Sequence, residues 1–273
     1  MTTDAIQVEL SEGAACAGAL LVGADGVASR IRALAGIASE HQALDDLALT
    51  AVLKTTEPHR DHAWQRFWPD GPLALLPLGG AYTRSLIWSA PAATVQKLLA
   101  LPEPAFEEEL ARRAPAFGDF HLCSPRQTFP LGLGQAHRYI GTRVALVGDA
   151  AHQMHPLAGQ GMNLGLEDAA ALAATLADRR YGMDPGDHRR LRHYERWRKA
   201  ANTPMLQGVE WLRRLFGARH PALVAVRTFG LHLTEHQPWL KRQLIYQAAG
   251  LHEDRPETGR SSSAARGGPL KPY

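Results

Sequence analysis

The chain has 273 residues, enough to bury one large core or two smaller ones. Its net charge of +3 is too small to indicate nucleic-acid binding, and no apolar run reaches the roughly 18 residues that a membrane span needs. The start lacks the basic and apolar stretches of a signal peptide, and the two cysteines, Cys16 and Cys123, form no CxxC pair. We therefore expect a cytoplasmic protein without a nucleic-acid partner, whose two thiols are buried or partly buried.

Strands dominate the first half of the predicted structure. Two come early, at residues 5–10 and 19–22, and the second is expected to be short and buried. A group of strands separated by Gly and Pro turn signals follows and is typical of an antiparallel sheet; its members are expected at 47–55, 64–68, 73–78 and 85–89. Proline precedes two expected helices, at 92–101 and 105–114, and one more strand is expected near 127–131.

The most informative segment begins at Arg143. An apolar run over 143–147 ends at Gly148-Asp149 and predicts a central parallel strand that is covered on both faces. A glycine-rich loop at 156–161 follows, and helical spacing runs over 163–178. Backbone N–H groups at a helix start are unpaired and carry the positive end of the helix dipole. This order of elements predicts a site for an anionic or electron-rich ligand, with Asp149 accepting hydrogen bonds from ligand hydroxyls.

Each residue of this segment also has a simpler explanation when taken alone. A single glycine is usually a turn, and a single aspartate is usually a cap. His152 and His155 have no third ligand nearby, which favours loop packing, or a contact to a ligand, over a metal site.

A second strand–turn–helix pattern lies near the N-terminus, over residues 20–32. It contains Asp25, Gly26, Ser29 and Arg32. Asp25 and Ser29 are good cap residues, and Arg32 could simply be a surface residue.

Both segments resemble fingerprints of the group A flavoprotein hydroxylases, which are FAD-dependent aromatic-ring monooxygenases. Residues 143–168 are similar to the second FAD fingerprint of that family, and residues 20–32 are similar to its Asp-Gly motif. The resemblance implies that Asp149 binds the ribitol chain of FAD, and that Asp25 and Arg32 support FAD and NAD(P)H. It also implies a loop and helix start that pack along the isoalloxazine ring: Pro156, Gly159, Gln160, Gly161, Met162 and Asn163.

Three segments favour the ubiquinone-biosynthesis branch of these hydroxylases: residues 67–78, the loop at 155–165, and the stretch from 212 to 250. The resemblance implies a prenylated phenol or another aromatic compound as substrate, with O2 and NAD(P)H as co-substrates. It further implies peripheral contact with the inner face of the membrane and other ubiquinone-biosynthesis proteins as partners. Phe67, Leu76 and Trp88 would then line an apolar substrate pocket, although core packing is the commoner explanation for any one of them.

The implied fold is α/β, with a partial Rossmann-like FAD-binding domain of the para-hydroxybenzoate hydroxylase type. We expect FAD-binding parts at 1–40 and 131–180 and an antiparallel-sheet substrate domain at 41–130. A helical region at 181–250 and a disordered, low-complexity tail at 251–273 complete the expected order.

The first fingerprint of the family, a GxGxxG after the first strand, does not occur in the sequence. We therefore expect an N-terminally truncated chain, or a mis-assigned start, that binds FAD poorly and has little or no activity. A non-catalytic remnant or partner protein, and a related flavin hydroxylase of small aromatic acids, stay open as alternatives.

The stretch from 188 to 242 is rich in basic residues, among them Arg189, Arg190, Arg192, Arg196, Arg198, Lys199, Arg213 and Arg214. A solvated helix face is the simplest explanation. Attraction to anionic phospholipid is the alternative.

Overall fold

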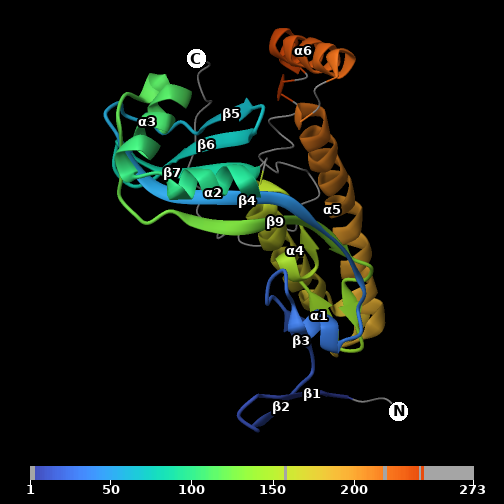
Figure 1. Cartoon of the computed structure of the whole chain (residues 1–273). Helices are drawn as coiled ribbons and strands as arrows, with labels where there is room; N and C mark the ends of the chain where they lie inside the picture. Colours follow the sequence, from blue (N-terminus) through green and yellow to red (C-terminus); the bar gives the residue numbers. More distant parts are fainter. Residues whose placement is uncertain (1–3, 157–158, 218–219, 240, 243–273) are drawn as a thin grey trace, which may run out of the picture.

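The computed structural model describes residues 4–156, 159–217, 220–239 and 241–242. Leu157 and Ala158 of the glycine loop, the predicted helical stretch beyond residue 242, and the predicted tail at 251–273 lie outside the described residues. Figure 1 shows a large sheet and a smaller one linked by the long, curved strands β4 and β9, with α5 running past both. The α/β fold inferred from the resemblance is confirmed.

The smaller sheet contains the strands that precede the two sequence motifs. Its central strand is β11 (Val144–Leu146), which is parallel to β3 (Leu21–Gly23) and antiparallel to β10 (Ile140–Gly141). All three residues of β11 are buried, as its apolar run predicted. Buried side chains of α4 (Gly161–Ala177) and α5 (His188–Gly217) pack in the same apolar cluster as β11.

The larger sheet is antiparallel, as the turn signals predicted, and has seven strands among the described residues. Its strand order is β12-β9-β4-β7-β6-β5, and β8 pairs with β4. The bounds are β4 Ser39–Thr55, β5 Trp64–Trp68, β6 Gly71–Pro77, β7 Thr83–Pro91, β8 Phe120–Leu122, β9 Gln127–Ala136 and β12 His152–Gln153. A register shift between Ala43 and Leu47 interrupts the pairing of β4 with β9, as a bulge does where strands bend.

One face of the large sheet is covered by α2 (Ala92–Ala100) and α3 (Glu103–Arg113), which Figure 1 shows against the strands. Residues paired in register point to the same side of a sheet. Leu49 and Leu73 both pair with Trp88, and all three are fully buried in one cluster with the helices. This cluster is the second apolar core of the chain.

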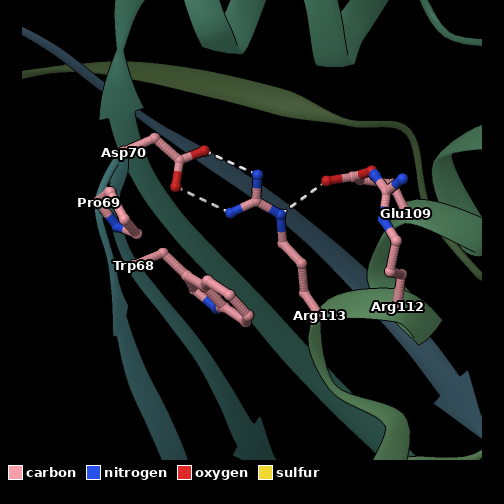
Figure 2. Close-up of a pocket in the computed structure, with 6 residues that line it drawn as sticks. All are labelled: Trp68, Pro69, Asp70, Glu109, Arg112 and Arg113. Atoms are coloured by element: carbon pink, nitrogen blue, oxygen red, sulfur yellow. Dashed lines mark hydrogen bonds and ion pairs between the residues drawn. The ribbon is translucent and has the colours of Figure 1, made fainter.

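Arg113 fastens α3 to the sheet beside this core (Figure 2). Its two Nη atoms each donate to a carboxylate oxygen of Asp70 at 2.8 Å, and its Nε donates to Glu109 at 2.7 Å. The guanidinium carbon also lies 4.4 Å from the ring centroid of Trp88. The pocket drawn in Figure 2 contains none of the predicted cofactor residues, and Arg113 already pairs with both of its acidic side chains.

We expect Arg113→Ala to lower the free energy of unfolding by about 2–3 kcal/mol, because it leaves a partly buried carboxylate without its cation. The matched control is Arg112→Ala, since that side chain is 73 % exposed. It should cost no more than about 0.5 kcal/mol. Urea unfolding followed by tryptophan fluorescence measures both losses, and equal losses would contradict the role of Arg113.

The helical prediction for the C-terminal region is confirmed by α5 and by α6 (Pro221–His236). The basic residues of α5, however, do not form a uniformly solvated face. Arg190 and Arg198 are 3 % and 4 % exposed, whereas Arg189, Arg192 and Arg196 are exposed. Arg190 donates to the backbone carbonyls of Asp178 and Gly182, so its side chain helps to fix the turn before α5.

Two predictions of burial are wrong. Both cysteines are exposed: Cys16 lies in β2 (Ala15–Gly18), whose pairing partner in the described structure is β1 (Ile6–Glu9) of a two-stranded sheet, and Cys123 follows β8. Val22 in β3 is 42 % exposed, although the strand was expected to be buried. Among the described residues β3 pairs on one side only, with β11, so it forms an edge of its sheet.

Candidate functional site

The two sequence motifs meet at one edge of the smaller sheet. In the parallel pair, Val22 of β3 lies opposite Ala145 of β11, so the turns that follow these strands emerge on the same side. Arg32 joins the two turns across 118 residues of sequence. Its Nη1 donates to the carbonyl of Ala150 at 2.8 Å, and its Nη2 donates to the carbonyl of Val27 at 2.8 Å.

Asp25 shapes the turn after β3 and supports the start of α1 (Arg30–Leu34), whose N-cap is Ser29. Its Oδ1 accepts from the Ser29 hydroxyl at 2.5 Å, and its Oδ2 accepts from the backbone N–H of Ile31 at 3.0 Å. Burial raises the pKa of Asp25, but these hydrogen bonds outweigh that effect, and the pKa lies below its usual value. The capping explanation therefore describes Asp25 and Ser29, while Arg32 is a bridge between motifs rather than a free surface residue.

Asp149 stands at the end of β11 in a short 3-10 turn, Gly148–Ala150. Gly148 has a φ of +58°, in the left-handed region that favours glycine. The side chain of Asp149 is exposed, whereas the neighbouring Ala150 is buried. The turn is also pressed against α4, because a Cβ added to Gly165 would lie 3.3 Å from the Cα of Gly148. The exposed carboxylate of Asp149 is thus carried by a turn that packs closely against α4.

The start of α4 is open in the described part of the chain, in the sense that no side-chain hydrogen bond caps it there. The helix begins at Gly161, two residues before the predicted start, and its N-cap Gln160 makes no side-chain cap hydrogen bond. No acidic side chain lies in this described first turn, so none there offsets the positive end of the helix dipole. Met162 is 76 % exposed, and the Nδ2 of Asn163 donates to the Oε1 of Gln160 at 3.1 Å. Pro156 and Gly159 flank the two undescribed loop residues, and Gly159 has a φ of +63°.

Both histidines near the loop are packed inside the protein. His155 is 2 % exposed; burial, and then the charge of Arg213, lower its pKa to about 4, so its ring is neutral at pH 7. His152 is also 2 % exposed, and its Nε2 lies 2.6 Å from the Oδ2 of Asp168.

Asp168 is the site residue that the sequence analysis missed. It is fully buried on α4 and accepts hydrogen bonds from Gly148, His152, Arg198 and Asn202. A signal was present in the sequence: Asp168 lies four residues from both Leu164 and Leu172, on the apolar face of the helix. A carboxylate at such a position needs polar partners in the core.

The three residues predicted to line a substrate pocket do not share a face of the large sheet. Phe67 pairs with Pro72, and Leu76 pairs with Ser85, on the face away from α2 and α3. Trp88 points to the opposite face and is fully buried in the core, the alternative that the sequence analysis gave. Phe216 of α5 lies against Phe67, with ring centroids 4.2 Å apart. Phe67 and Leu76 therefore remain predicted substrate contacts. Trp88 lies on the opposite face of the sheet and cannot line the same pocket.

The fold and these two turns define a dinucleotide-type site in which a parallel strand pair ends beside an open helix start. Residues 3–209 match the protein family described as FAD binding domain, and the chain belongs to that family. The resemblance inferred from the two motifs, and FAD as the cofactor of the family, are confirmed.

Named relatives agree with this assignment. The chain is 40 % identical, over 273 positions, to ubiquinone hydroxylase UbiL of Rhodospirillum rubrum, covering 98 % of this chain and 62 % of that protein. It is 37 % identical, over 276 positions, to the mitochondrial ubiquinone biosynthesis monooxygenase COQ6 of Danio rerio, covering 88 % and 57 %. OxyS anhydrotetracycline hydroxylase from Streptomyces rimosus has a similar structure, with a TM-score of 0.64, 27 % identity, and coverage of 93 % of this chain and 51 % of that chain. The chain thus spans 57 % to 62 % of the length of these two curated relatives.

The residues present fit the flavin end of FAD. An exposed carboxylate follows β11, where it can accept hydrogen bonds from hydroxyl groups. The glycine backbone at Gly159 and Gly161 has no side chain to hold a flat ring away, and a Cβ added to Gly159 would meet no atom within 4 Å among the described residues. The open start of α4 favours the electron-rich edge of such a ring.

Proposed function

We propose that this chain works in an FAD-dependent monooxygenase that hydroxylates a phenolic ring with NAD(P)H and O2. The proposed substrate is a prenylated phenol of ubiquinone biosynthesis, in line with the ubiquinone hydroxylase at 40 % identity. The observation that carries the proposal is the joining of the two motif turns by Arg32 beside the open start of α4.

Each residue of the site has a role in binding or orientation. Asp149 would accept hydrogen bonds from the ribitol hydroxyls, and Arg32 would hold the two turns at a constant separation. The N–H groups at the start of α4 would stabilise negative charge at the pyrimidine side of the ring. Phe67 and Leu76 would give the substrate an apolar surface and exclude water from it. FAD, when bound, supplies the redox chemistry.

The direct test is substrate-dependent oxidation of NADH or NADPH by the purified protein supplied with FAD and a short-chain prenylated phenol. Hydroxylated product formed in step with nicotinamide oxidation supports the proposal. Turnover of a small aromatic acid but not of the prenylated phenol would favour the related class of flavin hydroxylases. Absence of both activities, together with a stop codon upstream of Met1 in the genomic DNA, would favour a non-catalytic remnant or partner protein. An in-frame strand–GxGxxG–helix at that place would instead supply the first fingerprint.

We further propose that the protein resides in the cytoplasm and contacts the inner face of the membrane, where other ubiquinone-biosynthesis proteins would be its partners. No helix in the described part of the chain is both long and apolar enough to cross a membrane. The proposed contact is α6, on which Val226, Phe229 and Leu233 are 54 %, 68 % and 41 % exposed. Their spacing of three and four residues puts them on one side of the helix. Basic residues lie near α6 in the sequence: Arg213, Arg214, Arg227, Lys241 and Arg242.

We expect the protein to float with vesicles that contain phosphatidylglycerol at low salt, and Phe229→Ser to weaken that binding about tenfold, because the ring no longer enters the interface. Met183→Ser is the matched control, since Met183 is 83 % exposed outside α6. It should bind as the unaltered protein does. Absence of flotation at low salt would contradict the membrane contact and leave the proposed hydroxylase activity standing.

A further inference from the structure

The carboxylate of Asp168 lies at the junction of the Asp149 turn, α4 and α5. The side chain is fully buried, and each of its oxygens faces a different element. Oδ2 accepts from the backbone N–H of Gly148 at 3.0 Å and lies 2.6 Å from Nε2 of His152. Oδ1 accepts from Nε of Arg198 at 2.6 Å and from Nδ2 of Asn202 at 3.0 Å.

These four groups complete the hydrogen bonding of a charge in the protein interior. Burial raises the pKa of Asp168, but the bond and charge of His152 and the bonds from Arg198 and Asn202 lower it, and the pKa lies below its usual value. The residue is thus an ionised acceptor, and His152 donates to it through Nε2. A buried carboxylate of this kind is stable only while all of its donors stay in place.

The two carboxylate oxygens of Asp168 bond to different parts of the chain. Gly148 and His152 bracket Asp149 in sequence, so Oδ2 determines where the Asp149 turn sits. Arg198 and Asn202 belong to α5, whose far end carries Phe216 against Phe67 on the face of the large sheet away from α2 and α3. One carboxylate therefore links the turn to the helix that also borders that face.

We propose that Asp168 is a positioning residue for the cofactor site. Its two oxygens fix the position of the Asp149 turn relative to α5. The proposal rests on the proposed role of Asp149 toward FAD. It does not require Asp168 to touch the cofactor.

Asp168→Asn is the first test, because an amide has one oxygen in place of two acceptors. We expect the amide oxygen to stay hydrogen-bonded to the Arg198 cation. The NH2 group then turns toward the N–H of Gly148, so that two donors face each other. We expect the Gly148 amide to exchange with solvent at least tenfold faster in the protein without FAD, and FAD to bind at least tenfold more weakly by flavin fluorescence. Faster exchange at Gly148 tests the positioning separately from FAD binding, so failure of the proposed function does not hide the result.

Adding Arg198→Gln to Asp168→Asn should restore both measurements toward their original values. The pair is neutral, so the amide oxygen at position 168 can face Gly148 and His152. Its NH2 group can then donate to the new amide oxygen at position 198 and to the side-chain oxygen of Asn202. This rescue also covers the case in which the single variant fails to fold, because the second change removes a buried cation that has lost the charge of Asp168.

Two controls separate positioning from stability. Glu167→Gln alters the acid that lies 3.2 Å from Nη2 of Arg198 and leaves the carboxylate of Asp168 in place, so it should leave FAD affinity unchanged. Leu172→Ala makes a cavity in the same core and should lower the unfolding temperature without changing Gly148 exchange to the same extent. Normal Gly148 exchange in Asp168→Asn, or no rescue in the folded double variant, would overturn the proposal.

Discussion

Asp149→Ala is expected to weaken FAD binding by about ten- to a hundredfold while the unfolding temperature stays within a few degrees of the original. The carboxylate is exposed on a turn whose neighbours are buried, so its removal leaves the core packing unchanged. A hydrogen bond to a charged group contributes about 1.5–3 kcal/mol, which corresponds to this range of affinity. Titration of flavin fluorescence gives the dissociation constant, and thermal unfolding gives the stability.

The matched control for this prediction is Asp61→Ala, because Asp61 is an acid whose side chain is 97 % exposed far from the turn in sequence. It should leave FAD affinity unchanged. Asp149→Asn should lose less affinity than Asp149→Ala, since the amide oxygen can still accept from a hydroxyl. Equal affinities for the unaltered protein and Asp149→Ala would remove Asp149 from the site.

Gly165→Val is expected to lower the free energy of unfolding by about 2–3 kcal/mol and to reduce FAD binding below detection. A Cβ at Gly165 would already lie 3.3 Å from the Cα of Gly148, and the branched valine side chain needs more room than that. Overpacking of this kind in a close-packed core costs about 1–3 kcal/mol. The strain falls on the turn that carries Asp149, so affinity and stability should both fall.

Gly208→Val serves as the control, because Gly208 lies on α5 with no atom within 4 Å of its added Cβ among the described residues. It should keep the original FAD affinity and should not lower stability, since valine forms helix more readily than glycine. Chemical unfolding and flavin titration of the two variants make the comparison. A stable, FAD-binding Gly165→Val protein would contradict the close support of the turn by α4.

Local patterns in the sequence predict those elements that carry a strong periodic signal. The apolar run before Gly148 predicts β11, and the spacing after the glycine loop predicts α4 to within two residues at its start. β10 and β12 have two residues each, too few to show any period, and were not predicted. The exposure of Cys16 and Val22 depends on which elements cover β2 and β3, which residue type alone does not determine.

The same reasoning predicts the motif residues of the site but not the contacts between them. Asp149 and Arg32 could be named from sequence, whereas the bond from Arg32 to Ala150 joins positions 118 residues apart and depends on the pairing of β3 with β11. Trp88 was grouped with Phe67 and Leu76 because the resemblance to the ubiquinone-biosynthesis branch implied an apolar substrate pocket there. A strand alternates its faces residue by residue, so only the pairing register separates them.

The expected binding place for the flavin end of FAD is the turn after β11 together with the start of α4. It is tested most directly by recording backbone amide resonances of the isotopically labelled protein while FAD is added, a method that also detects weak binding. We expect the largest shifts at Gly148, Asp149 and Ala150 and at residues 159–163. Shifts confined to other surfaces, such as the pocket beside Trp68 and Arg113, or no shifts at saturating FAD, would contradict it.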